Sequence, residues 1–207
     1  MLDLGCGTGR LPCRIAIEGL DVTGVDPSEA MLRVARSRPG SERVSWIKAT
    51  GQALHSPARF DFIYMTGHAF QALLTDDAAI SLLRTVHDHL TKNGRFVFET
   101  RNPAKKAWLL WTPNHRNCIT TPERGRIEES REAAFDGMTG VVNLTHSYRF
   151  LDEGNTVTGR TRLRFIEQDH LRRLLTAASL EPQAWYGDWD RTPLTQVSPE
   201  IIVETRC

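Results

Sequence analysis

The sequence predicts an α/β protein, with a mostly parallel β-sheet, helices on both faces and an inserted antiparallel β-meander. Three observations support this prediction. The first ten residues follow the pattern strand, glycine turn and helix, which is typical of a nucleotide-binding βα unit. Apolar strand segments then alternate with amphipathic helical segments as far as residue 100. Three segments of alternating polarity, separated by glycine turns, follow between residues 126 and 165 and indicate the meander.

The opening turn has a glycine spacing that indicates its ligand. Gly5, Gly7 and Gly9 follow the apolar end of a strand and let the backbone turn where a Cβ atom would block a ligand. A dinucleotide-binding turn needs its third glycine at the position of Arg10, and no lysine–serine pair of a phosphate-binding loop follows. Asp3 lies two positions before the first glycine. The whole stretch, Leu-Asp-Leu-Gly-Cys-Gly-Thr-Gly-Arg, resembles motif I of the class I S-adenosylmethionine-dependent methyltransferases.

This resemblance covers nearly all of the 207 residues. It implies a Rossmann-like fold with a seven-stranded sheet, whose last two strands form an antiparallel hairpin at the edge. It also implies S-adenosyl-L-methionine as the cofactor and transfer of a methyl group to oxygen or nitrogen of a small-molecule acceptor, as in the bacterial small-molecule enzymes of this class. Three alternatives stay open: a nicotinamide oxidoreductase, a catalytically impaired S-adenosylmethionine-binding protein, and an RNA methyltransferase.

Periodicity and capping signals place the elements along the chain. Thr75 is a typical N-cap for a long amphipathic helix, because acidic residues follow it in the first turn. The pair Asn93-Gly94 is predicted to end that helix. The other predicted helices cover residues 8–19, 27–37 and 168–179. The predicted strands cover residues 1–4, 21–26, 43–49, 59–65, 95–100, 126–135, 141–150, 156–165, 183–187 and 201–205.

The predicted cofactor site extends from the glycine turn to the ends of the next strands. Asp26 ends the second strand, and a carboxylate there can accept hydrogen bonds from both hydroxyls of a ribose. The resemblance implies that Met31 packs against the adenine. Thr50 stands where relatives often have an aspartate, so adenine binding is expected to use the backbone of Gly51 and Gln52. The full predicted set is Asp3, Gly5, Cys6, Gly7, Gly9, Asp26, Pro27, Met31, Thr50, Gly51, Gln52, Met65, Thr66, Gly67 and Phe70.

The predicted acceptor site begins in the loop of residues 66–71. This loop follows a central parallel strand, so it should open on the ligand crevice. His68 is the one side chain in it that can act as a base near pH 7, and Asp188 is a weaker candidate. No Asn-Pro-Pro-Tyr sequence follows the strand, which disfavours planar amine acceptors such as adenine. The predicted acceptor contacts are His68, Gln71, Arg101, Asn102, Trp108 and Tyr186.

The stretch of residues 101–131 combines basic and aromatic side chains. It carries seven Lys or Arg residues against three Glu, together with Trp108 and Trp111. Proteins that stack nucleic-acid bases use such residues, but the net charge of the whole chain is only +1. A loop that covers a small anionic or aromatic substrate is therefore favoured over a nucleic-acid surface. The resemblance implies that the β insertion forms a wall of the acceptor pocket or a subunit contact, so a homodimer through it is one expectation.

Length and composition predict one domain over residues 1–207, with a substrate-side loop and β insertion at 101–165. The four cysteines show no metal-ligand spacing, so no metal site and free thiols in a reducing cytoplasm are expected. No signal peptide or membrane span is recognisable. Related enzymes usually carry an N-terminal helical segment that covers the cofactor. Because Met1 already lies in the first strand, this segment is expected to be missing.

Overall fold

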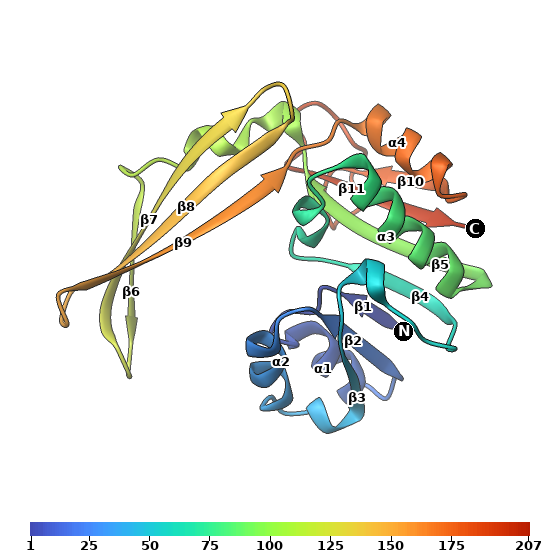
Figure 1. Cartoon of the computed structure of the whole chain (residues 1–207), viewed down its shortest axis with the longest axis horizontal. Coiled ribbons are helices and arrows are strands. Elements are labelled where there is room, and N and C mark those ends of the chain that lie inside the picture. Colours follow the sequence, from blue (N-terminus) through green and yellow to red (C-terminus); the bar gives the residue numbers. More distant parts are fainter.

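The computed structural model describes residues 1–207 and contains two β-sheets (Figure 1). The larger sheet has seven strands in the order β10-β11-β5-β4-β1-β2-β3. The first five strands of the chain are mutually parallel, whereas β11 pairs antiparallel with β5 and with β10. The predicted mostly parallel sheet with an antiparallel edge hairpin is confirmed. Its strands are β1 (Leu2–Leu4), β2 (Val22–Asp26), β3 (Val44–Lys48), β4 (Phe60–Met65), β5 (Leu90–Arg101), β10 (Glu181–Tyr186) and β11 (Glu200–Arg206).

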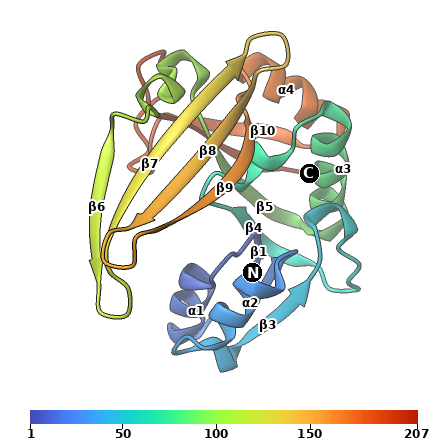
Figure 2. The ribbon, with the colours of Figure 1, turned by 60° about the vertical axis from the view of Figure 1, so that its left-hand side comes forward.

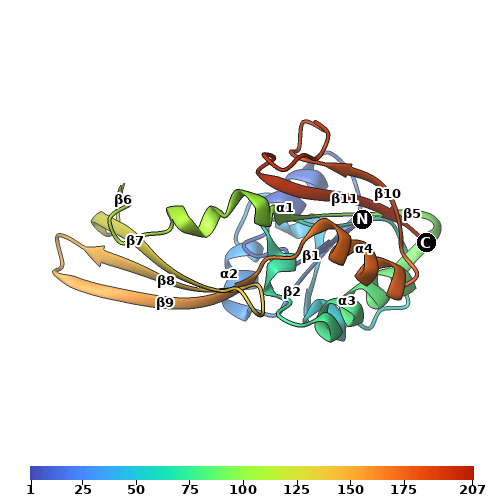
Figure 3. The same cartoon turned by 90° about the horizontal axis from the view of Figure 1, so that it is seen from above.

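Helices cover both faces of this sheet. Helix α1 buries Cys13 and Ala16 against the β2–β3 side, where they meet Val22 and Val44. Helices α3 and α4 lie together on the other face (Figure 3), and their buried leucines form the main core with β1, β4 and β5. This core has 24 buried residues, among them Phe96 stacked on Phe98. The helices are α1 (Arg10–Ile17), α2 (Glu29–Arg36), α3 (Asp76–His89) and α4 (Gln168–Ala177).

The predicted end of the long helix is wrong, although its predicted start is confirmed. The Thr75 hydroxyl accepts a hydrogen bond from the Ala78 N–H at 3.2 Å, as an N-cap does. Helix α3 ends at His89, and the chain passes directly into β5. Gly94 lies inside β5, where an added Cβ would stand 2.9 Å from the Phe60 carbonyl oxygen. This glycine serves a close approach of β4 and β5 at their register shift, not a helix terminus.

The inserted meander forms a separate antiparallel sheet that projects from the body of the molecule (Figures 1 and 2). Three of its strands match the predicted segments, and a fourth, β6, precedes them. The sequence of β6 contains polar residues and an exposed isoleucine, so it lacks the alternation that marked the other three. The strands are β6 (Arg116–Thr121), β7 (Gly125–Asp136), β8 (Val141–Phe150) and β9 (Asn155–Arg164).

A small aromatic cluster fixes the base of the meander. Trp108 lies in a short 3₁₀ helix (Ala107–Leu110) and is only 9% exposed. Its ring stacks on Phe135 at 4.3 Å between centroids and meets Phe165 edge-on at 4.6 Å. Val142 and Leu144 of β8 complete the cluster. The tryptophan that was predicted to contact substrate is therefore a core residue of the insertion.

No helix combines the length and apolar character that a membrane crossing requires.

Replacing the buried tryptophan should destabilise the protein more than replacing an exposed one. We expect Trp108→Ala to lower the free energy of unfolding by about 3–5 kcal/mol, because it removes a large buried ring and leaves a cavity. Trp189→Ala, at a tryptophan that is 51% exposed, should change it by less than about 1 kcal/mol. Urea unfolding followed by circular dichroism measures both. Equal effects of the two substitutions would contradict the assignment of Trp108 to the core.

Candidate active site

The glycine turn is tied to the end of β2. The backbone N–H groups of Gly5 and Cys6 both donate to the Val25 carbonyl, at 2.8 and 3.0 Å. The Gly7 N–H donates to Oδ2 of Asp26 at 2.9 Å. Gly5, Gly7 and Gly9 all have positive φ, at 77°, 53° and 70°, a region that favours glycine. The turn therefore holds one shape, set by bonds to the neighbouring strand.

The three glycines of the turn serve different purposes. An added Cβ at Gly9 would lie 2.6 Å from the Trp46 ring and 2.7 Å from the Ala35 side chain, so this glycine permits close packing of α1. At Gly5 the Cβ would stand 2.9 Å from that of Ala69. No atom lies within 4 Å of the Cβ position at Gly7. Open space at a glycine with positive φ is what a backbone that approaches a ligand requires.

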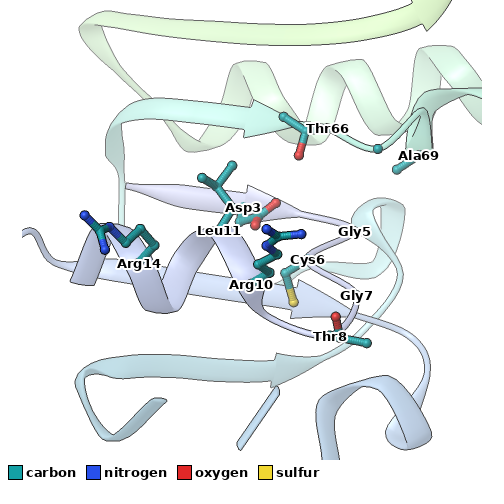
Figure 4. A pocket seen from close by; sticks show the side chains of 11 residues that line it. Asp3, Gly5, Cys6, Gly7, Thr8, Arg10, Leu11, Arg14, Thr66 and Ala69 are labelled. Carbon is teal, nitrogen blue, oxygen red and sulfur yellow. The ribbon is translucent and has the colours of Figure 1, made fainter. Parts of the chain in front are cut away.

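A cavity of about 520 Å³ opens beside this turn, between β1, α1 and the loop after β4 (Figure 4). Its size is that of an ordinary small-molecule site. Figure 4 shows the carboxylate of Asp3 at the sheet and the side chains of Arg10 and Leu11 from the start of α1. The lining residues are Asp3, Gly5, Cys6, Gly7, Thr8, Arg10, Leu11, Arg14, Thr66, Gly67 and Ala69.

Asp3 is a buried carboxyl at the sheet side of this cavity. It is 2% exposed and forms no ion pair. Burial, assisted by the nearby Asp26 carboxylate, raises the pKa of Asp3 to about 7. Tyr64 lies opposite Asp3 in the β1–β4 register, and its nearby hydroxyl partly offsets this rise in the pKa of Asp3. A cationic ligand group in the cavity would stabilise the ionised form of Asp3.

The Asp26 carboxylate stands at the carboxyl end of β2, where the sequence predicts it. Its Oδ2 accepts from Gly7 and its Oδ1 accepts from the Ser28 N–H at 2.8 Å. Each carboxylate oxygen has a second lone-pair site that remains available to a ligand hydroxyl. Pro27 and Met31 lie exposed just beyond it. These residues line no part of the cavity of Figure 4 but continue the same edge of the sheet.

The residues predicted for the adenine have structural duties of their own. The Thr50 hydroxyl accepts from the Ala53 N–H at 3.3 Å and caps a short 3₁₀ turn (Gly51–Ala53). An added Cβ at Gly51 would lie 2.2 Å from the Leu82 side chain. The Gln52 carbonyl accepts a long 3.5 Å bond from the Thr85 hydroxyl. Glycine at position 51 is thus required by packing on α3.

The loop after β4 places two of the predicted cofactor residues at the cavity and one in the protein core. Thr66 and Gly67 line it, and Met65 is buried at the end of β4. Phe70 was predicted to contact the cofactor, but it is 0% exposed and stacks on Phe98 in the main core at 4.4 Å. Phe70 lies in the short 3₁₀ helix Ala69–Ala72, and its apolar ring packs in the main core with buried residues of α3. Phe70 is corrected to a core residue.

His68 lies between the cavity-lining residues of this loop and is held by two carboxylates. Its backbone N–H donates to Glu99 Oε1 at 3.0 Å. Its Nε2 lies 3.0 Å from Glu200 Oε1. The residue has a φ of 61°, which is uncommon outside glycine. His68 therefore keeps its place beside the cavity through contacts with β5 and β11.

Two predicted acceptor residues, Gln71 and Asn102, are engaged inside the protein. Gln71 is fully buried, and its amide donates to the Arg164 carbonyl at 3.1 Å. Asn102 is 5% exposed and donates to the Thr195 and Ser198 carbonyls. Both side-chain amides form hydrogen bonds within the protein. Neither Gln71 nor Asn102 therefore offers a free amide to an acceptor.

Neither Arg101 nor Tyr186, two further predicted acceptor residues, lines the cavity beside the glycine turn. Arg101 donates to Gln71 Oε1 at 2.7 Å, and its guanidinium stacks 5.2 Å from the centre of the Trp111 ring. Burial lowers its pKa, although the charges of Glu200 and Glu99 act in the opposite direction. Tyr186 borders a separate hollow with Asp188, so neither Tyr186 nor Asp188 lines the cavity beside the glycine turn.

Sequence reasoning missed Glu99, Glu200 and the α1 side chains that line the cavity. Glu99 approaches His68 because β5 pairs with β4, and Glu200 does so because β11 pairs antiparallel with β5, with Glu200 opposite Arg101. No local pattern signals such a contact. The α1 residues could have been found, because Arg10 and Arg14 are one helical turn apart and follow the glycine turn directly.

The ionisation of Asp3 should make stability depend on pH. Between about pH 4 and 7 the folded protein holds a proton on Asp3 that the unfolded chain has lost, so wild-type stability falls as pH rises through this window. We expect Asp3→Asn to be the more stable protein at pH 8, by on the order of 1–4 kcal/mol, and the difference to disappear near pH 4. Urea unfolding at several pH values without added ligand measures this. Glu132→Gln, at an exposed carboxylate, should show no such crossover; parallel profiles for Asp3→Asn and wild type would contradict the prediction.

Comparison with known proteins shows similarity to methyltransferases. Residues 1–94 match the family model described as a methyltransferase domain. A putative methyltransferase of Geobacillus sp. (strain WCH70) is 30% identical over 107 residues, which are 51% of this chain and 43% of that protein. The chain therefore spans less than half the length of that relative. The cypemycin N-terminal methyltransferase of Streptomyces sp is 29% identical over 210 residues, covering 98% of this chain and 81% of that protein.

The fold points the same way over the whole chain. The methyltransferase CcbJ from Streptomyces caelestis superposes with a TM-score of 0.84 and 24% sequence identity, covering 100% of this chain and 82% of that one. The first 94 residues therefore match a methyltransferase domain, and the whole chain shares the fold of a solved methyltransferase.

Proposed function

We propose that this protein transfers a methyl group from S-adenosyl-L-methionine to nitrogen or oxygen of a small-molecule acceptor. The observation that carries the proposal is the open space at Gly7, in a turn fixed by Asp26 and facing a cavity with the buried carboxyl of Asp3. An unpaired buried carboxyl beside an open glycine turn suits a ligand with a cationic group and an adenosyl group. The family match over the same residues supports this reading.

Residues of the cavity and of the adjoining sheet edge would each contact a different group of this cofactor. Asp3 would accept hydrogen bonds from the ammonium of the methionine end, which restores the charge that burial disfavours. Asp26 would accept from the ribose hydroxyls, and exposed Met31 would cover the adenine. When bound, the cofactor supplies a methyl group already activated by the positive sulfonium. The protein then mainly has to align the acceptor and exclude water.

On the acceptor side, His68 would take the proton that the acceptor loses. His68 does not line the cavity itself, but its neighbours Gly67 and Ala69 do, so its ring would have to reach the acceptor from the edge of that space. Arg101 and Trp111 form a stacked pair at the junction with the meander, and neither lines the cavity itself, so they would contact only the outer part of the acceptor. A histidine base and aligned groups are sufficient for this transfer, because the leaving group needs no further activation.

A nitrogen acceptor receives the stronger support. The relative that covers nearly the whole chain is named for methylating the N-terminus of cypemycin, and an N-terminus offers an amine. A nucleic-acid acceptor receives little support. Trp108 is buried, and four of the seven basic residues in 101–131 (Arg116, Arg124, Arg126 and Arg131) form ion pairs with neighbouring carboxylates.

The meander also offers a subunit contact, and we include a homodimer through it in the proposal. Its outer strands β6 and β9 are exposed along nearly their whole lengths, and edge strands of this length favour pairing with another chain. The four free cysteines fit a reducing compartment such as the cytoplasm.

Two other readings are weaker. A nicotinamide oxidoreductase would need a glycine at Arg10, which is the first residue of α1 and lines the cavity. A protein that binds the cofactor without transferring its methyl group would have the same cavity. Measurement of methyl transfer from labelled cofactor distinguishes it from an enzyme.

An alanine at Gly7 should weaken cofactor binding at little cost to stability. Its Cβ would enter the open space where the ligand is expected, so we expect at least a tenfold weaker affinity for S-adenosylmethionine. Gly154→Ala is the matched control: Gly154 also has a positive φ and open space around its Cβ position, but lies in the β8–β9 turn. Both should lose about 1 kcal/mol of stability. Isothermal titration calorimetry measures binding; similar affinities for the two variants would remove Gly7 from the site.

The activity itself is tested with cofactor labelled in the methyl group. Purified protein should move the label to a member of a panel of primary amines, peptides with a free N-terminus, and hydroxylated small molecules, and His68→Gln should reduce the rate by about 10²–10⁴-fold. Transfer to RNA alone would favour the RNA methyltransferase. Tight binding of the cofactor with no transfer to any acceptor would favour the binding protein, and binding of labelled nicotinamide dinucleotide would favour the oxidoreductase.

A further inference from the structure

His68 has a strained backbone conformation, and neighbouring side chains hold it there. Its φ of 61° is a left-handed conformation that costs a residue with a Cβ on the order of 1 kcal/mol or more. Glu99 compensates at the backbone, because its buried carboxylate accepts the His68 N–H at 3.0 Å. Strain that the surroundings hold in place is a feature of functional positions. The backbone bond alone, however, leaves the imidazole free to rotate about its side-chain torsions.

A second carboxylate fixes the ring. Nε2 of His68 lies 3.0 Å from Oε1 of Glu200, the first residue of β11. The two side chains are only 24% and 19% exposed. An ionised carboxylate can only accept hydrogen bonds, so the proton of this bond must belong to Nε2. In the neutral ring, Nδ1 then carries the lone pair, and no protein group occupies it.

Glu200 has no other side-chain partner that would explain its place. Its Oε2 is buried and forms no hydrogen bond, and its one ion pair is with His68. Arg101 lies close enough for Glu200 to affect its pKa, but the guanidinium bonds to Gln71. Strand pairing supplies the rigid support: Glu200 lies opposite Arg101, and its backbone N–H donates to the Gly187 carbonyl.

We propose that Glu200 is the positioning residue of His68: it accepts the Nε2–H bond, fixes the orientation and tautomer of the ring, and leaves Nδ1 to receive the proton of the acceptor. The acceptor nitrogen or oxygen forms the bond to the methyl carbon, the electrons of the broken carbon–sulfur bond remain on sulfur, and the acceptor's proton passes to Nδ1. Glu200 stabilises the positive ring that results, as the carboxylate of a catalytic triad does. The proton transfer to Nδ1 rests on the proposed function. The assignment of the His68 tautomer does not depend on it.

Nitrogen-15 NMR of protein labelled in its histidines tests the tautomer without any acceptor. Long-range correlation spectra distinguish a protonated from an unprotonated ring nitrogen, and His68→Gln identifies the His68 signals. We expect neutral His68 to have a protonated Nε2, an unprotonated Nδ1 and an Nε2–H signal protected from solvent exchange. In Glu200→Ala that N–H signal should be lost by exchange, since its acceptor is gone. Glu204→Gln, on the same strand and paired with Arg95, should leave the His68 signals unchanged.

Two results would overturn the proposal. A wild-type His68 with its proton on Nδ1 would do so even if Glu200→Ala failed to fold. An Nε2–H signal equally protected in Glu200→Ala, in a variant whose backbone spectrum shows the native fold, would also do so.

The kinetic arm uses whichever amine or hydroxyl probe takes the label in the acceptor panel. Glu200→Gln keeps a hydrogen-bond acceptor but removes the charge, so we expect kcat to fall at least tenfold, with affinity for S-adenosylmethionine changed less than twofold. An unchanged kcat would restrict Glu200 to a structural role. If the wild-type protein methylates no probe, the proposed function fails, while the NMR result still decides whether Glu200 fixes the His68 ring.

Discussion

The bond between the Gly7 N–H and the Asp26 carboxylate is the constraint on which the site depends. It joins the turn after β1 to the carboxyl end of β2, and the two N–H groups bonded to the Val25 carbonyl repeat the connection. The turn therefore cannot relax into the cavity, although it contains three glycines. One carboxylate thus does two things: it shapes the glycine turn and it presents its remaining lone pairs along the sheet edge. Loss of Asp26 would consequently affect the turn as well as any ribose contact.

The register of the sheet explains why acidic groups gather on one side of it. Asp3 lies opposite Tyr64, Tyr64 lies opposite Val97, and side chains opposite one another share a face. Glu99 follows Val97 by two residues and so joins the same face. Leu2 and Leu4 of β1 point to the other face and enter the main core. Because the side chains of a strand alternate, the three residues of β1 place Leu2 and Leu4 in the core and Asp3 on the side of the cavity.

The sequence predicted the parts of this arrangement that depend on local chemistry. The turn at Gly5, the strand-end Asp26 and the cap at Thr75 all lie where short patterns placed them. Predictions for side chains after a strand were less successful. Gln71 and Trp108 looked like acceptor contacts, but the meander folds back and buries both. The contact between His68 and Glu200 spans 132 residues, so only the pairing of β11 with β5 reveals it.

The same long-range contacts decide how the meander relates to the active site. Gln71 leaves the loop after β4 and bonds both to Arg101 at the end of β5 and to the Arg164 carbonyl at the end of β9. Arg164 in turn pairs with Asp76 in the first turn of α3. Since Gln71 lies three residues beyond His68, a shift of the meander on binding an acceptor would be transmitted to the loop that carries the proposed base. The insertion is therefore connected to this loop through the part-buried hydrogen bonds of the Gln71 side chain, which a simple covering loop would not need.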